Sequence, residues 1–76
     1  MTEQQINLVK KYLDNRKENE KCIQMLEIIN SETIEIVDPV TRRNKLVPNN
    51  DGYRINIIQK NIHPTILNKI LYKELL

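Results

Sequence analysis

The chain has 76 residues, a formal net charge of +2 at pH 7 and 39% hydrophobic residues. This length suits one domain, residues 1–76, whose single small core contributes only a few kcal/mol of net stability. Self-association, or binding to a larger partner, would be a natural way to gain further stability. One cysteine and one histidine exclude an intrachain disulfide and a thiolate-rich zinc site, and so small a net charge does not by itself indicate a nucleic-acid partner.

The composition also bears on source and compartment. Asn, Lys and Ile are abundant, whereas there is one Gly and no Ala; the abundant residues have A/T-rich codons, which favours an A+T-rich genome such as that of a phage or mobile element. The first residues, MTEQQ, lack the basic and apolar regions of a secretory signal. Apolar runs are too short to span a bilayer, so we expect a cytoplasmic protein with no membrane partner.

Residues 3–29 are predicted to be helical, because they contain good helix formers and neither Gly nor Pro. Two apolar faces, around residues 6–13 and 22–29, are rotated from one another by roughly 100°. The polar stretch between them allows two interpretations. One long helix, which we favour, would project its middle into solvent; a helical hairpin would break near Asn15, with Asn15 or Asp14 as the second N-cap.

Residues 33–60 are predicted to form a three-stranded antiparallel meander, because the apolar period changes to two. Asp38-Pro39 and the run Asn-Asn-Asp-Gly at 49–52 are typical of turns. The strands are expected at 33–38, 43–48 and 53–59. The predicted fold class is therefore α+β, in the order α-β-β-β-α.

Burial of one sheet face would fix the register of the first two strands. Leu46 should share its face with Ile34 or Ile36, which leaves a loop of three residues, 39–41, or of five, 39–43. A two-residue loop, 39–40, would put both isoleucines on the face of Lys45, and we reject it. A four-residue loop at 49–52 then places Leu46 opposite Ile55, on the same buried face.

A C-terminal helix is predicted for residues 64–75. Pro64 is favoured at the first helical position, and His63 before it is expected to be an N-cap or junction residue. The predicted apolar stripe is Ile66, Leu67, Ile70, Leu71 and Leu75.

The basic residues of the meander are the first candidate binding surface. Residues 39–60 carry five positive charges against Asp51 alone, a local excess of four. Arg and Lys on an open sheet face contact phosphates or an anionic partner, whereas the plainer interpretation is a solvated face whose charges protect the strand edges. The candidate residues are Arg42, Arg43, Lys45, Arg54 and Lys60.

The polar stretch Asp14–Lys21 is the second candidate, as a helix interface. It contains no apolar residue, and mixed charges on a projecting helix steer a protein partner; a merely solvated helix face has the same composition. The candidate residues are Arg16, Lys17, Glu20 and Lys21.

No pattern of residues indicates catalysis. There is no Gly-rich phosphate loop, HExxH, CxxC or GxSxG. Cys22 lies on an apolar helix face, which is typical of a small core residue. We therefore expect no enzyme, cofactor, metal or small-molecule substrate.

A non-enzymatic protein-interaction module is the function that these observations favour. The small size and A+T-rich coding suggest a phage or mobile-element protein that binds and modulates or inhibits a larger host protein. One alternative is a small DNA- or RNA-binding regulator that uses the basic hairpin. A structural subunit of a homo-oligomer is another.

Overall fold

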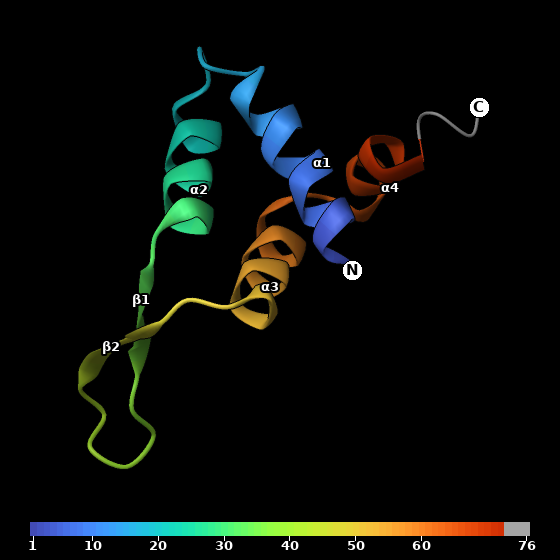
Figure 1. Ribbon diagram of the computed structural model, residues 1–76. Coiled ribbons are helices and arrows are strands. Elements are labelled where there is room, and N and C mark those ends of the chain that lie inside the picture. The colour runs from blue at the N-terminus through green and yellow to red at the C-terminus, as the bar shows by residue number, and fades with distance from the viewer. Residues whose placement is uncertain (73–76) are drawn as a thin grey trace.

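The computed structural model describes residues 1–72 and contains four helices and one two-stranded antiparallel sheet. The α+β class is confirmed, but the order is α-α-β-β-α-α rather than α-β-β-β-α (Figure 1). The elements are α1 (Glu3–Asp14), α2 (Glu20–Asn30), β1 (Thr33–Val37), β2 (Asn44–Pro48), α3 (Asp51–Asn61) and α4 (Pro64–Tyr72). None of these helices is long and apolar enough to cross a membrane.

The N-terminal segment is a helical hairpin, so the favoured prediction of one continuous helix is wrong. Helix α1 ends at Asp14, and Asn15 is its C-cap, not the N-cap of the next helix. The N-cap of α2 is Asn19, whose side-chain oxygen accepts from the backbone N–H groups of Lys21 at 3.0 Å and Cys22 at 3.3 Å. Folding back at residues 15–19 lets both apolar faces reach one core, which a straight helix could not do.

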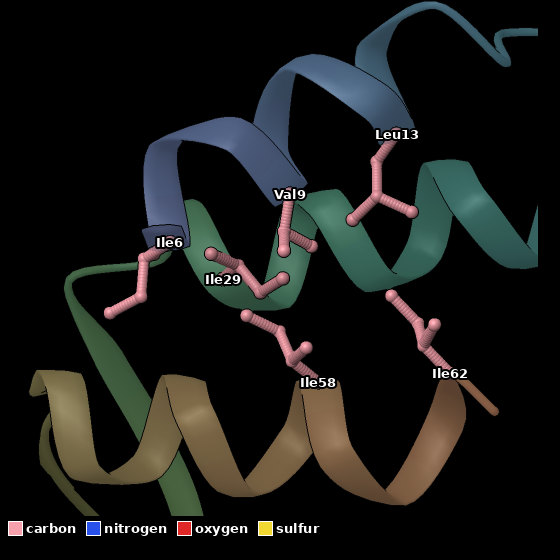
Figure 2. Close-up of a cluster of buried hydrophobic side chains, with 6 residues drawn as sticks. All are labelled: Ile6, Val9, Leu13, Ile29, Ile58 and Ile62. Atoms are coloured by element: carbon pink, nitrogen blue, oxygen red, sulfur yellow. The ribbon is translucent and has the colours of Figure 1, made fainter. Parts of the chain in front are cut away.

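The core is made of helices. Six apolar side chains, from α1, α2, α3 and the residue that follows α3, point toward one another (Figure 2). They are Ile6, Val9, Leu13, Ile29, Ile58 and Ile62. Helix α1 packs against all three other helices. Leu67, Ile70 and Leu71 of α4 pack partly buried at the rim of this cluster, and Cys22 lies there as predicted.

Helix α3 occupies the segment that was predicted to be the third strand. Asn50 is its N-cap and accepts from the N–H of Tyr53 at 3.0 Å, so the Asn-Asn-Asp-Gly run starts a helix instead of turning a hairpin. Ile58 and Ile62 are four residues apart, on one helical face that reaches the core. A strand would point Ile57 inward instead of Ile58, and it would lose this burial.

Ile34 and Ile36 share the face of Lys45, which is the arrangement that we rejected, but the loop between the bonded pair Asp38 and Arg43 is residues 39–42 and not 39–40. The predicted loops 39–41 and 39–43 are both wrong. Leu46 is opposite Glu35, and Ile36 is opposite Lys45. Within residues 1–72, no helix covers the face of Leu46, which is 71% exposed, so burial does not decide the register. The connecting turn decides it: Arg42 has a φ of 57° and its N–H donates to the carbonyl oxygen of Asp38 at 2.8 Å.

Helix α4 begins at Pro64, as predicted. The ring Nδ1 of His63 accepts from the N–H of Thr65 at 3.2 Å, which is the junction role expected of this histidine. Ile66 of the predicted stripe is exposed, and Leu75 lies outside the described residues.

Substitutions in α3 test the helical assignment. Ile58→Ala should lower the free energy of unfolding by about 2–5 kcal/mol, because it empties a fully buried site. The matched change Ile57→Ala, at a half-buried site, should cost about 1 kcal/mol. Urea denaturation measures both, with Ile→Val at the same positions if Ile58→Ala does not fold. A larger loss of stability from Ile57→Ala than from Ile58→Ala would support the predicted strand instead of the helix.

Candidate binding site on the β-hairpin

The hairpin of β1 and β2 stands apart from the helical core. Figure 1 shows it extending from the C-terminal end of α2 away from the helices, and the molecule is 48 Å long but only 25 and 20 Å across. In the described part of the chain, no hairpin residue belongs to the buried cluster or to its partly buried rim. The two strands pack mainly on one another. The hairpin is therefore the projecting element, a role that we predicted for the N-terminal helix.

Both outer edges of the hairpin present backbone hydrogen-bonding groups. The N–H of Asp38 donates to Arg43, and that of Asn49 donates to Glu32, at 2.8 and 2.9 Å. Because bonded and non-bonded pairs alternate along an antiparallel ladder, these two bonds fix which residues face outward. The outward N–H and C=O groups belong to Thr33, Glu35 and Val37 on β1 and to Asn44 and Leu46 on β2, where Pro48 presents only its C=O.

Apolar side chains are exposed on the hairpin. Val37 and Leu46 share one face and are 62% and 71% exposed, and Val40 in the turn is 88% exposed. The opposite face carries Ile34, Ile36 and Val47, which are half-buried. The hairpin thus offers contact residues on both faces as well as on its edges.

Asp38 organises the turn at the tip. Its carboxylate accepts from the N–H of Val40 at 2.8 Å and of Thr41 at 3.4 Å, and it lies 3.5 Å from the Lys45 Nζ. The Val40 and Thr41 bonds, and then Lys45, hold the pKa of Asp38 below its ordinary value, against partial burial. Ionised Asp38 therefore stabilises the turn at neutral pH, and that contribution is lost as the pH falls through the lowered pKa.

The base of the hairpin is fixed to the end of α2 by two side chains, which we call the clamp: Asn49 and Arg54. The Asn49 amide nitrogen donates to the carbonyl oxygens of Ile28 at 3.1 Å and Ser31 at 2.9 Å, and the Arg54 Nε donates to that of Ile29 at 2.8 Å. Helix α2 has no basic residue in its last turn, so the clamp supplies partners for carbonyl groups that a helix end leaves free.

The five predicted basic residues do not form one surface. Arg42 and Arg43 are exposed in the turn, and Lys45 pairs with Asp38. Arg54 is committed to the clamp and to Asp51, 3.1 Å from its Nη1. Lys60 lies on α3, where it lines a hollow with Lys21 of α2. Only the three hairpin residues remain neighbours, because position 54 is on a helix and not on a strand.

The predicted helix interface lies at the far end of the helical hairpin. Arg16 and Lys17 are in the turn between α1 and α2, and Glu20 and Lys21 are in the first turn of α2. All four are exposed. The Arg16 guanidinium lies over the Tyr12 ring, 4.5 Å from its centroid, which holds one of the four in place. They surround a tight polar turn and not the middle of a projecting helix.

The outer edge of β1 is the feature that the sequence analysis missed. The predicted meander also leaves the first strand at an edge of the sheet, but we considered only the charged face of that sheet as a binding surface. The change of the third strand to a helix exposes the outer edge of β2 in addition. Within residues 1–72, no group of three His, Cys, Asp or Glu side chains is placed to hold a metal ion. The surface hollows lie along the α1–α2 turn, between α1 and α2, and between α2 and α3.

No protein-family model, curated protein or solved structure matches this chain. A function for the chain is therefore inferred from the geometry of the hairpin.

Arg54 and Arg43 provide a matched test of the clamp. Arg54→Ala should lower the free energy of unfolding by about 1.5–3 kcal/mol, because it removes a charged donor to a helix-terminal carbonyl. Arg43→Ala, at an exposed position, should change it by less than about 0.5 kcal/mol. Urea denaturation followed by circular dichroism measures both changes. Equal effects would mean that Arg54 is a surface charge and not a structural donor.

Proposed function

We propose that the chain is a non-enzymatic protein-binding module and that the β1–β2 hairpin is its binding element. The observation that carries this proposal is the projection of a sheet that has only two strands within residues 1–72 and on which Val37, Val40 and Leu46 are largely exposed. Exposed apolar side chains on a projecting element are typical of protein-interaction sites.

The energetics of the hairpin support the same conclusion. A two-stranded sheet is marginally stable in water unless another surface packs against it. Here the clamp and the Asp38 turn hold the two ends of the hairpin, while Leu46 and Val37 on one of its faces stay exposed. A prearranged hairpin loses little conformational entropy on binding, and the partner would supply the surface that the hairpin lacks.

The partner class is suggested by size and composition. A small chain with A+T-rich coding suits a phage or mobile-element protein, so the proposal extends to a larger host protein that is modulated or inhibited on binding. Nucleic acid is the less favoured partner. Between positions 32 and 48, three acidic residues balance three basic ones: Glu32, Glu35 and Asp38 against Arg42, Arg43 and Lys45.

Capture experiments with matched variants test the proposal. The tagged chain is used to capture proteins from a lysate of the source cells, beside Val37→Thr/Leu46→Thr and the control Leu8→Gln/Ile66→Gln, which removes exposed apolar groups from the helices instead. The hairpin variant should lose a protein that the wild type and the control both retain, because only that variant removes contact area from the binding element.

Three results would contradict the proposal. One is capture that survives in the hairpin variant, and another is capture lost only in the helix control. The third is a chain that is monodisperse by light scattering and captures no protein. Retention of DNA on a filter at about 50 mM salt, with a steep loss at higher salt, would favour the nucleic-acid alternative.

A further inference from the structure

The two edges of the hairpin differ in their ability to accept another strand. On β2, the outward residue Pro48 has no N–H, and Lys45 lies in the same strand; proline and lysine are common means of blocking an edge strand. On β1, all three outward residues have an N–H. Within the described residues, only the carbonyl of Thr33 has a local partner on that edge, the Ser31 hydroxyl at 2.7 Å. The β1 edge is therefore the open one.

The charge along the β1 edge is negative. Glu32 and Glu35 are exposed, and neither is in an ion pair with any residue of the described chain. Glu35 lies opposite Leu46 and on the same face as the exposed Val37, whereas Ile34 and Ile36 are on the other face. A strand beside β1 would thus meet one carboxylate and three apolar side chains.

We propose that the free edge of β1 binds an extended segment of the partner protein as a third strand, which is apolar and β-branched except for a Lys or Arg opposite Glu35. Backbone hydrogen bonds along the edge supply the affinity, and the side chains facing positions 34–37 supply the specificity. Opposite charges directly across two strands stabilise the pair. This inference rests on the proposed function and specifies how the hairpin binds.

A second copy of the chain is a poorer occupant. Two β1 strands paired about a two-fold axis at Glu35 would place like carboxylates opposite each other, which is destabilising. Pairing of β1 with the β2 edge of another copy would meet the missing donor at Pro48, and this head-to-tail contact would give a ring or a filament instead of a two-fold dimer. The charge of the edge favours a basic segment from a different protein.

Selection from a displayed library of random peptides against the full-length chain tests the inference. Enriched peptides should be β-branched with a Lys or Arg. Binding of the best synthetic peptide is then measured by fluorescence polarisation to the wild type, to Val37→Pro and to the control Leu46→Pro. Each proline removes an outward N–H and leaves the hairpin ladder intact, and circular dichroism verifies the helical core.

Val37→Pro should weaken binding about tenfold or more, since it removes a backbone donor and obstructs the edge, whereas Leu46→Pro should stay close to the wild-type affinity. Glu35→Lys leaves the backbone unchanged, so it tests the charge without any risk to the hairpin. It should weaken binding about fivefold.

Four outcomes would overturn the inference: peptides that bind equally to Val37→Pro, peptides that are acidic, enrichment of none, or a wild-type dimer that Val37→Pro converts to a monomer. If any of these accompanies hairpin-dependent capture of a protein from lysate, the edge inference fails while the proposed function stands. Capture that does not depend on the hairpin removes the proposed function itself.

Discussion

The junction between α2, the hairpin and α3 depends on the hydrogen bonds that Asn49 and Arg54 donate to the last carbonyl groups of α2. Helix α2 ends at Asn30 without a glycine cap or a basic side chain in its last turn. The Ile28 carbonyl accepts from the Ser31 N–H at 3.3 Å, and the other carbonyls of the helix end need donors from elsewhere. The Asn49 amide reaches Ile28 and Ser31, and the Arg54 guanidinium reaches Ile29. The same bonds set where the hairpin leaves the body and where α3 begins.

From this junction the chain divides into two parts with different roles. The helices bury a core of isoleucine, leucine and valine around α1, and burial of these side chains stabilises the fold. The hairpin takes no part in that core, and its register comes from Asp38 and the positive φ of Arg42. An element that the core does not need, fixed at its base and ordered at its tip, is free to be used for binding.

Local sequence signals predicted only part of this arrangement. Pro64, the strand at 33–37 and the apolar helix faces were readable because each depends on neighbouring residues. The helical structure of α3 could not be predicted in this way. Tyr53, Ile55 and Ile57 alternate as in a strand, whereas Ile55, Ile58 and Ile62 have the spacing of a helix face. Only packing against the core selects the helix. The role of Arg54 was hidden for the same reason: its partner, the Ile29 carbonyl, is far away in the sequence.

Residue-resolved hydrogen exchange of the β1 amides, measured by NMR on the isolated protein, tests most directly whether an ordered hairpin presents an open edge. The N–H groups of Ile34 and Ile36 should be protected, because they lie in the ladder with β2, whereas those of Glu35 and Val37 should exchange as solvent-exposed amides. Protection of all four would mean that the edge is already covered, and protection of none would mean that the hairpin does not form; either result would contradict the account.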